Sequence, residues 1–473
     1  MNIVGRKDEI ELLNDALLSE KPEFIAVYGR RRVGKTYLIK EYFDEDFSFY
    51  ATGVPNLTTR KQLRVFHGAL KQYGCKEKRL PSDWFEAFER LRELLESDRV
   101  NRNAESNKRV VFLDEVPWMA GPKSDFKAAL DLFWNSYAST KKDILLIICG
   151  SATSWIIDNV INDTGGFHNR LTNTIHLMPM SLLECYDLSI ANNLNLTRDE
   201  VALCYMVLGG IPYYFSLLKN RYSVHQNIDN LLFKENGQLH NEFNSLFSSL
   251  FKKHENHIAI VLALSNSKNG LLRSEIMNCE GVTGGISLTR ALKELEQCGF
   301  IRKYRNFITK KNDSVYQLID PFTLFAIKFL NNQRFDSWLS FTNTPGFYNW
   351  RGNAFETIAF NHVKQIKKAL GVYGVETMEY AFKSKKTKAG SQIDLVIDRK
   401  DGVTNICELK YADEEYVIDD NYRNNLMNKI QTFGEESKTR SSIHLTLLTS
   451  CGIVHNQNSR IINEELTLDD LFI

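Results

Sequence analysis

Residues 24–36 join an apolar segment to a glycine-rich loop whose residue types are suited to binding phosphate. Phe-Ile-Ala-Val-Tyr is followed by Gly-Arg-Arg-Arg-Val-Gly-Lys-Thr, which has the spacing G-x-x-x-x-G-K-T. Glycine lets backbone N–H groups close around phosphate oxygens, the lysine can reach the β- and γ-phosphates, and the threonine hydroxyl can bind Mg²⁺. Helix-forming residues follow, so the phosphates would lie at a helix N-terminus. The residues that we expect to bind a nucleoside triphosphate are Gly29, Arg30, Arg31, Arg32, Val33, Gly34, Lys35 and Thr36.

A phosphate loop needs carboxylates that hold Mg²⁺ and polarise the attacking water. Residues 109–115, Arg-Val-Val-Phe-Leu-Asp-Glu, supply an apolar strand that ends in two carboxylates. We assign Asp114 to Mg²⁺, through water, and Glu115 to the general base for hydrolysis. The pattern is common by itself, but its position about 80 residues after the loop strengthens the assignment.

Two further segments carry polar groups that can reach the γ-phosphate. The segment 143–149, which is apolar after Asp143, leads into Gly-Ser-Ala-Thr-Ser, and parallel strands place ligand groups at their carboxyl ends. Ser151 is therefore our candidate for sensing the γ-phosphate, with Thr153 as the alternative and simple capping of the next helix as the competing explanation. Arg170 follows a glycine-containing loop and can act as an arginine finger or sensor. An ordinary salt bridge within the loop explains this arginine equally well.

A second group of charged residues lies toward the C-terminus, on two runs that alternate apolar and polar residues. Ser-Gln-Ile-Asp-Leu-Val-Ile-Asp and Val-Thr-Asn-Ile-Cys-Glu-Leu-Lys flank Arg-Lys-Asp-Gly, which is a strong hairpin signal. A three-residue loop, 400–402, with Gly402 in the left-handed conformation places Asp394 opposite Glu408. Two carboxylates that meet in this way need a cation, and Mg²⁺ prefers such oxygens. Lys410 shares a face with Glu408 and would orient water or stabilise a phosphate transition state.

Length and composition describe an ordinary globular chain of several domains. The sequence has 473 residues, 43% of them hydrophobic and 25% charged, and a net charge of +1. Any surface for nucleic acid must therefore be local. No apolar run approaches the roughly 18 residues of a membrane span, and the N-terminus has no signal-peptide core. The eight cysteines are scattered without a C-x-x-C pair, so we expect reduced thiols, no zinc site and a cytoplasmic protein.

The middle of the chain changes from one helical pattern to another. Residues 181–250 carry periodic apolar positions and suit a helical lid. Residues 256–320 predict three helices, the last stopped by Gly299, and then two short strands, which is the order of a winged helix. Basic residues gather in the expected wing, namely Arg302, Lys303, Arg305, Lys310 and Lys311. They can neutralise DNA phosphates while the third helix enters a groove, and the alternative is a structural or protein-binding role.

The order of the N-terminal motifs resembles the archaeal-type ATPases, a branch of the STAND class of P-loop NTPases that is related to AAA+ proteins. The resemblance rests on Gly5-Arg6…Glu9, the triple-arginine phosphate loop, Leu-Asp-Glu, Gly-Ser and Gly209-Gly-Ile-Pro-Tyr-Tyr, and it covers roughly residues 1–330. It implies a five-stranded parallel sheet, a helical lid and a winged helix, ATP rather than GTP, and contact of Pro212 with the nucleotide side of the lid. One departure concerns Arg170, because the preceding position, often glycine in this family, is Asn169.

The C-terminal hairpin resembles the PD-(D/E)XK nuclease superfamily through the layout D…E-x-K. Glu356, within Gly-Asn-Ala-Phe-Glu, matches a helix-borne glutamate of such enzymes, and Gln431 on the following helix is a further candidate. The resemblance spans roughly residues 345–450 and implies Mg²⁺-dependent cleavage of DNA, with a DNA-binding or partner-docking remnant as the alternative. The lysines just before the hairpin, which can hold a DNA backbone, are Lys383, Lys385, Lys386 and Lys388.

Together these patterns predict an α/β protein with a P-loop NTPase parallel sheet, a helical lid, a winged-helix domain and a C-terminal α/β nuclease-like domain. The expected boundaries are 1–180 for the ATPase core, 181–252 for the lid, 253–330 for the winged helix, 331–344 for a linker and 345–473 for the nuclease-like domain. We expect an ATP-hydrolysing switch that uses ATP and Mg²⁺ and acts on DNA. The alternative is an ATP-dependent signalling scaffold or DNA-binding regulator with an inactive tail. The sequence does not indicate an oligomeric state.

Overall fold

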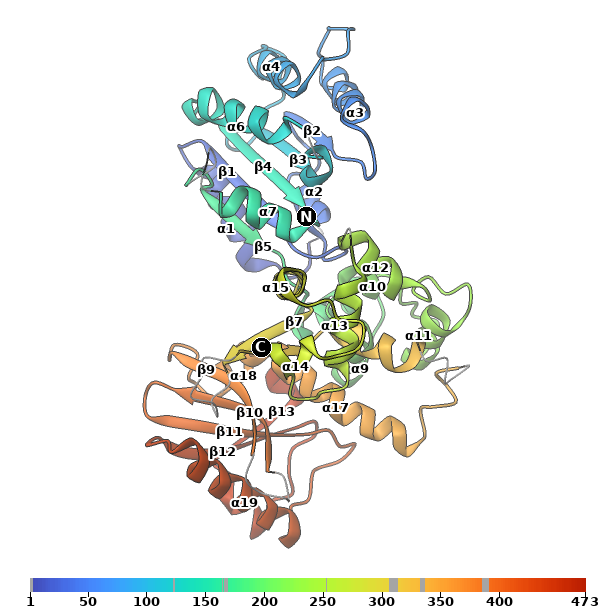
Figure 1. Ribbon diagram of the computed structural model, residues 1–473, viewed down its shortest axis with the longest axis vertical. Coiled ribbons are helices and arrows are strands. Elements are labelled where there is room, and N and C mark those ends of the chain that lie inside the picture. The colour runs from blue at the N-terminus through green and yellow to red at the C-terminus, as the bar shows by residue number, and fades with distance from the viewer. Residues whose placement is uncertain are drawn as a thin grey trace. The chain divides into compact units, whose positions relative to one another are not determined.

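The computed structural model describes residues 3–121, 124–163, 165, 169–251, 253–305, 314–331, 337–384 and 391–473 (Figure 1). The chain divides into two compact units, residues 1–178 and 179–473. In the part of the chain that the structure describes, the first unit is built on one β-sheet, and the second contains helices and two further sheets. Among the described residues, no helix has the length and the apolar character that a membrane crossing requires.

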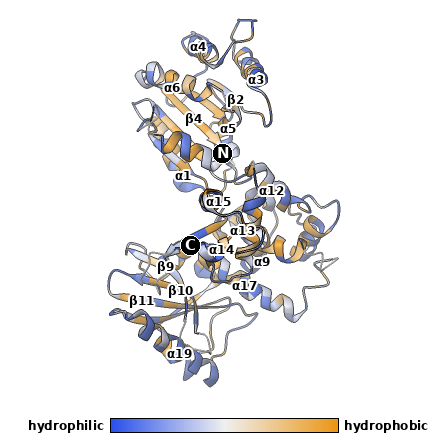
Figure 2. Cartoon of the chain, in the orientation of Figure 1, coloured by the Kyte–Doolittle hydropathy of each residue, from blue (hydrophilic) through white to orange (hydrophobic). Residues whose placement is uncertain are grey.

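The first unit contains a five-stranded sheet in which every strand pair is parallel, which confirms the predicted parallel sheet. Its strands are β1 (Glu23–Tyr28), β2 (Phe49–Thr52), β3 (Arg109–Asp114), β4 (Ile144–Gly150) and β5 (Asn173–His176), in the order β2-β3-β4-β1-β5. β3 and β4 are buried along their whole length, and β4 is largely hydrophobic (Figure 2). Because parallel strands end at one edge of a sheet, the residues that follow β1, β3 and β4 meet there.

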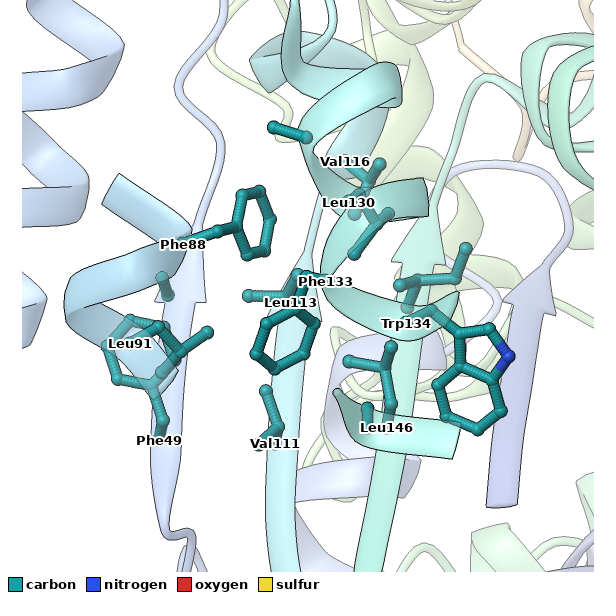
Figure 3. Close-up of a cluster of buried hydrophobic side chains, with 14 of the residues drawn as sticks. Phe49, Phe88, Leu91, Val111, Leu113, Val116, Leu130, Phe133, Trp134 and Leu146 are labelled. Carbon is teal, nitrogen blue, oxygen red and sulfur yellow. The ribbon is translucent and has the colours of Figure 1, made fainter. Parts of the chain in front are cut away.

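Helices cover this sheet and complete the first unit. They are α1 (Lys7–Leu18), α2 (Lys35–Tyr42), α3 (Thr59–Gln72), α4 (Trp84–Leu95), α5 (Val116–Met119), α6 (Phe126–Ser136) and α7 (Thr153–Ile156). Figure 3 shows side chains of β2, β3 and β4 facing those of α4 and α6; the labelled ones include Phe49, Phe88, Leu91, Val111, Leu113, Leu130, Phe133, Trp134 and Leu146. Each of these is at most 4% exposed, so each contributes about 1.5–3 kcal/mol by burial. The sheet is therefore a firm support for the loops at its edge.

The second unit begins with a helical region, as the apolar periodicity of residues 181–250 predicted. Its helices are α8 (Leu182–Ala191), α9 (Arg198–Leu208), α10 (Pro212–Phe215), α11 (Val224–Ile228) and α12 (Glu242–Leu250). α8 starts with a capping box in which the Ser181 hydroxyl accepts a hydrogen bond from the Glu184 N–H and the Glu184 carboxylate accepts one from the Ser181 N–H. This arrangement satisfies backbone groups that the first turn of a helix leaves unpaired.

A small three-stranded antiparallel sheet follows, accompanied by three helices. These elements are α13 (Glu255–Ser265), β6 (Leu271–Leu272), α14 (Arg273–Met277), α15 (Gly285–Gln297), β7 (Ile301–Arg305) and β8 (Ser314–Leu318), with the strand order β6-β8-β7. Gly299 follows α15 with a φ of 73°, the left-handed conformation that commonly ends helices. The chain therefore turns after α15 where the sequence predicted a stop.

The segment after α16 (Pro321–Phe325) differs from the linker that the sequence suggested at 331–344. In its described part, 337–344, Trp338 is fully buried. The Trp338 backbone N–H donates to Asp229 (2.7 Å) and its indole N–H donates to His225 Nδ1 (3.0 Å). The rings of Phe325 and Trp350 pack against it at centroid distances of 5.3 Å. Because polar and turn-forming residues surround Trp338 in the sequence, the sequence pattern did not predict its burial.

The last part of the second unit is a mixed five-stranded sheet with helices. Its elements are α17 (Pro345–Asn361), α18 (Val363–Ala369), β9 (Thr377–Lys383), β10 (Gln392–Arg399), β11 (Val403–Lys410), α19 (Asp420–Ser437), β12 (Ser442–Thr449) and β13 (Glu464–Thr467). The strand order is β13-β12-β11-β10-β9. β10 is antiparallel to both β9 and β11, and β12 is parallel to both β11 and β13. α19 is the crossover between β11 and β12.

The hairpin between β10 and β11 has the register that the sequence predicted. The paired residues run from Asp398–Thr404 to Leu395–Cys407, and Asp394 and Glu408 are the next residues of the two strands beyond the last pair. The loop is 400–402, and Gly402 has a φ of 86°. A side chain would be strained in this conformation, which explains the glycine.

Candidate functional site

The phosphate loop connects the end of β1 to the start of α2 and needs glycine at both of its ends. Gly29 has a φ of 147°, and a side chain there would lie 2.3 Å from the Leu177 carbonyl oxygen. Gly34 has a φ of 95° and directly precedes the first residue of α2. The loop therefore presents backbone N–H groups beside the positive end of a helix dipole, as an anion site requires.

Lys35 lies inside this loop and is only 6% exposed. Its ammonium group donates to the carbonyl oxygens of Gly29 (2.8 Å) and Arg30 (2.9 Å). Both acceptors are neutral backbone groups, so an anionic phosphate is a stronger partner for the same ammonium group. Of the other predicted loop residues, Arg30 and Val33 are buried, Arg32 is half-buried with a φ of 72°, and Arg31 is exposed.

Thr36 and Asp114 meet across the loop, as the magnesium assignment requires. The Thr36 hydroxyl donates to Asp114 Oδ2 at 2.9 Å, and the Glu115 backbone N–H donates to Asp114 Oδ1 at 3.0 Å. Burial, with the neighbouring Glu115 charge, raises the pKa of the Asp114 carboxyl. A hydroxyl and a carboxylate at this spacing are oxygen donors of the kind that Mg²⁺ accepts, so the two residues fit that ion.

Ser151 forms hydrogen bonds with Glu115 in the structure. Both its backbone N–H (3.3 Å) and its hydroxyl (2.9 Å) donate to Glu115 Oε2. Glu115 has a φ of 49°, an uncommon left-handed conformation for a side chain of this kind. Ser151 gives no side-chain cap to α7, and Thr153 is 1% exposed. The serine therefore fixes the direction of the Glu115 carboxylate, a function that the sequence did not predict.

Arg170 lies outside this cluster of hydrogen bonds. Arg170 is exposed in a turn. Burial and Asp163 raise the pKa of Asp131 in α6, and the charge of Arg170 opposes that shift. The arginine-finger role of Arg170 stays a prediction, and residues 166–168 of the same loop lie outside the described residues.

The Gly-Gly-Ile-Pro motif has a structural explanation within the second unit. Gly209 ends α9 with a φ of 64°, and a side chain at Gly210 would reach within 1.9 Å of the Met180 carbonyl oxygen. Pro212 is half-buried as the first residue of α10, a position where its missing N–H costs nothing. The contact of Pro212 with nucleotide stays a prediction.

Three buried carboxylates from three elements form a second cluster, which we call the carboxylate site. Glu356 comes from α17, Asp394 from β10 and Glu408 from β11, and they are 7%, 6% and 2% exposed. Burial raises the pKa of Asp394, and the Glu408 charge adds to this shift. The three predicted acidic residues of the C-terminal region are thus brought together.

Glu408 is held by two lysines and a tyrosine. Lys410 Nζ lies 3.1 Å from Glu408 Oε1, and Lys429 Nζ lies 2.6 Å from Glu408 Oε2. The Tyr422 hydroxyl donates to Glu408 Oε1 at 3.0 Å. Burial by itself would raise the pKa of Glu408, but Lys429 and Lys410 outweigh it and lower that pKa. Glu408 is therefore held as a charged carboxylate.

Glu356 and Asp394 share a third lysine, which comes from the turn between α13 and β6. Lys268 Nζ lies 2.5 Å from Glu356 Oε1 and 3.6 Å from Asp394 Oδ1. Burial and the Asp394 charge raise the pKa of Glu356 to about 7, against the opposing effect of Lys268. Among the described residues, no three His, Cys, Asp or Glu side chains are arranged to hold a metal ion. Carboxylate oxygens are ligands that Mg²⁺ prefers, but lysine ammonium groups lie beside the oxygens of this site.

Sequence reasoning missed three members of this site, namely Lys268, Tyr422 and Lys429. Gln431, the predicted contributor from α19, is exposed and bonds Glu435 instead. The positions 422, 426, 429 and 433 repeat at the spacing of one helix face, and Leu426 and Phe433 on that face are buried. This spacing is the signal that identifies Lys429 and excludes Gln431.

The predicted basic wing is described only in part. Lys310 and Lys311 lie outside the described residues, as do Lys385, Lys386 and Lys388 before the hairpin, and Lys303 and Lys383 are exposed. Arg302 does not present its guanidinium group as a phosphate-binding residue would, because that group contacts other side chains of the protein. Its guanidinium group lies 3.8 Å from the centroid of the Phe360 ring of α17 and donates to Gln317 at 2.6 Å. Burial lowers the pKa of Arg302 to about 10. This arginine therefore joins the small sheet to α17.

Residues 3–218 match a family model described as an ATPase domain predominantly from Archaea. An uncharacterized protein of Methanocaldococcus jannaschii is 23% identical over 334 residues, which are 69% of this chain and 68% of that protein. An uncharacterized ATP-binding protein of the same organism is 49% identical over 41 residues, 9% of this chain and 70% of that protein.

Two solved structures are similar to the chain. The Walker-type ATPase of Pyrococcus abyssi has a TM-score of 0.49 at 17% identity, over 69% of this chain and 96% of that chain. The ORC2 protein of Aeropyrum pernix has a TM-score of 0.41 at 15% identity, over 68% of this chain and 92% of that chain.

Proposed function

We propose that the chain, whose residues 3–218 match the model of an ATPase domain predominantly from Archaea, binds ATP with Mg²⁺, hydrolyses it, and uses this cycle to control a second site that acts on DNA. The observation that carries the first part is the meeting of Lys35, Thr36 and Asp114 at the phosphate loop. Lys35 would exchange its two carbonyl partners for phosphate oxygens. Thr36 and Asp114 would hold Mg²⁺, which neutralises phosphate charge when bound.

Glu115 is the base that we propose for the hydrolytic step. Its carboxylate would accept a proton from the attacking water as the oxygen of that water approaches the γ-phosphorus. Two hydrogen bonds from Ser151 fix the carboxylate at Oε2 and leave Oε1 for the water. Ser151 is thus a positioning residue, and its proposed effect on hydrolysis passes through Glu115.

DNA contact is proposed for residues 253–330 because their element order is that of a winged helix. α15 presents the exposed Arg290 and Lys293 on the face opposite the buried Leu288, Ala291 and Leu295. A helix of this kind can enter a groove while its basic residues contact phosphates. Arg302 is not part of this proposed surface, because it packs on α17.

The carboxylate site is proposed as a metal-dependent nuclease centre of the PD-(D/E)XK kind. Asp394 and Glu408 would hold Mg²⁺ with Glu356 beside them, and Lys410 would stabilise charge on the scissile phosphate. When bound, the metal would polarise that phosphate and lower the pKa of a water. A second candidate, a regulator that binds DNA without cutting it, is favoured by the lysines that now neutralise all three carboxylates.

Cleavage assays distinguish these two functions. Linear, nicked and branched DNA are incubated with Mg²⁺ or Mn²⁺, with and without ATP, and wild type is compared with Asp394→Ala. We expect metal-dependent cutting that the variant loses, while its ATP turnover is unchanged. Asp401→Ala, in the exposed hairpin turn, is the control that should still cut. Cutting that survives in Asp394→Ala contradicts the proposed centre, and absence of cutting in every condition favours the regulator.

A further inference from the structure

Of the three described lysines at the carboxylate site, Lys268 is the one that comes from outside the C-terminal sheet and its helices. It lies in the turn 266–270, between α13 and β6. Its side chain is 43% exposed, whereas that of Lys429 is 13% exposed. A lysine that remains half in solvent can leave its partners without unfolding the sheet that carries them.

The backbone around Lys268 is fixed by the small sheet. The Gln317 side-chain N–H donates to the Lys268 carbonyl oxygen at 2.6 Å, and the Tyr304 hydroxyl donates to the Asn269 carbonyl oxygen. Gly270 has a φ of 75°, and a side chain there would lie 2.3 Å from the Tyr316 carbonyl oxygen. These contacts fix the turn to β7 and β8, so the position of Lys268 follows that of the small sheet.

The small sheet is in turn attached to the helix that carries Glu356. Arg302 of β7 packs on Phe360 of α17, and Asn361 donates to the Ile319 carbonyl oxygen at 3.1 Å. Tyr304 of β7 also packs against the hydrophobic cluster of the C-terminal sheet. These contacts place Lys268 beside Glu356 and Asp394 in this arrangement, and a shift of the small sheet would withdraw it.

At Glu356 and Asp394, the Lys268 ammonium group competes with a divalent metal ion for the same oxygens. Mg²⁺ requires carboxylate oxygens at about 2.0–2.1 Å in near-octahedral geometry, whereas Lys268 Nζ already lies 2.5 Å from Glu356 Oε1. The two cations would also repel each other at this distance.

We propose that Lys268 is a tethered cation that closes the carboxylate site to a divalent metal ion until the turn 266–270 withdraws. This inference rests on the proposed metal-binding function of that site and adds its regulation. Residues 253–318 would then have two tasks, contact with DNA and control of metal entry. Movement of the small sheet on contact with DNA would admit the metal only when substrate is present.

The test is Mn²⁺ affinity, measured by titration calorimetry and by the electron paramagnetic resonance of bound Mn²⁺ on the full chain without DNA. Lys268→Met keeps the length of the side chain and removes its charge. We expect it to bind Mn²⁺ at least about tenfold more tightly than wild type. Lys303→Met, an exposed lysine of the same small sheet, should stay within about twofold of wild type. Lys268→Arg should keep the weak wild-type affinity.

The outcomes separate this inference from the function on which it rests. Equal Mn²⁺ affinity in wild type and Lys268→Met, lost when Asp394→Ala is added, overturns the tethered cation and leaves the metal site standing. No Mn²⁺ binding by any variant overturns both. Tighter binding that is equally seen in Lys303→Met reports net charge only, and it too overturns the proposal.

A measurement on the wild-type chain avoids any effect of substitution on folding. Lysine acylation followed by mass spectrometry reports how accessible each ammonium group is. Saturating Mn²⁺ should displace Lys268 and increase its acylation rate several-fold, with Lys303 unchanged. A Lys268 rate that does not respond to saturating Mn²⁺ contradicts displacement.

Discussion

The two candidate sites place lysines against opposite kinds of partner. At the phosphate loop, Lys35 donates to two neutral carbonyl oxygens of its own loop, contributed by residues five and six positions earlier. At the carboxylate site, lysines from a turn, a strand and a helix contact buried carboxylates. The first lysine has weak partners, and the second set has strong ones.

This difference shows which ligand each site is prepared to receive. An incoming phosphate replaces neutral acceptors at the loop with charged ones, so the exchange is favourable without rearrangement of the sheet. An incoming metal ion at the carboxylate site must displace ammonium groups that already neutralise the oxygens. The phosphate loop is therefore ready for its ligand, and the carboxylate site depends on a conformational change.

Lys35→Ala should break the first half of this comparison and has the largest expected effect. It removes the charged donor to the phosphates, and several charge-assisted hydrogen bonds of about 1.5–3 kcal/mol each are lost. ATP affinity should fall at least about 100-fold by titration calorimetry. Lys40→Ala, at a half-buried position near the end of α2 beside Glu45, is the control and should bind ATP normally. Unchanged affinity in Lys35→Ala would remove the phosphate-loop assignment.

Glu115→Gln should separate binding from hydrolysis at the same site. The amide keeps the size of the side chain but cannot accept the proton of the attacking water. We expect ATP binding close to wild type and a turnover rate lower by between about 10²- and 10⁴-fold. Ser151→Ala should lower turnover by about tenfold, since it removes one hydrogen bond to the charged group. Normal hydrolysis by Glu115→Gln would reassign the base.

A smaller expected effect is a loss of stability of the second unit at low pH, caused by His362. His362 accepts a hydrogen bond from the Leu182 N–H at Nε2 (2.9 Å), and its Nδ1 lies 2.8 Å from the Ile358 carbonyl oxygen. Burial lowers the pKa of His362 to about 4 from 6.5. A lowered histidine pKa gives stability that is fully present above pH 6.5 and is lost as the pH falls toward 4.

The expected loss for His362 is about 2 kcal/mol between pH 8 and pH 5. Urea unfolding at the two pH values measures it, and His362→Gln, which cannot gain a proton, isolates it from the titration of carboxylates. The pH-dependent loss should be smaller in the variant by that amount. An identical loss in both proteins would show that His362 is not the acid-sensitive group.

Local patterns in the sequence predicted the phosphate loop and the hairpin. The G-x-x-x-x-G-K-T spacing gives the strand, the loop and the helix N-terminus at once, because each residue type suits its own conformation. Asp-Gly between alternating runs gave both the register and the left-handed Gly402. In each case the residues that decide the geometry lie within a few positions of each other.

Contacts between distant residues could not be predicted in this way. Lys268 lies 88 positions before Glu356 and follows no periodic pattern with it. Ser151 was assigned to a phosphate because its strand end is shared with β1 and β3, but the position of Glu115 beside it depends on the left-handed backbone at residue 115. Arg302 was read as a charge in a basic run, although its burial on Phe360 depends on the docking of β7 against α17.

The order of residues in the carboxylate site has a consequence for the newly made protein. Lys268 precedes Glu356, Asp394 and Glu408 in the chain, so a ribosome releases the blocking cation before any of the acids that it neutralises. Chains fold from the N-terminus as they emerge, and the small sheet is complete at Leu318, before α17 begins. The carboxylate site therefore forms with the Lys268 ammonium group already in place, and each newly made chain is first in the closed state.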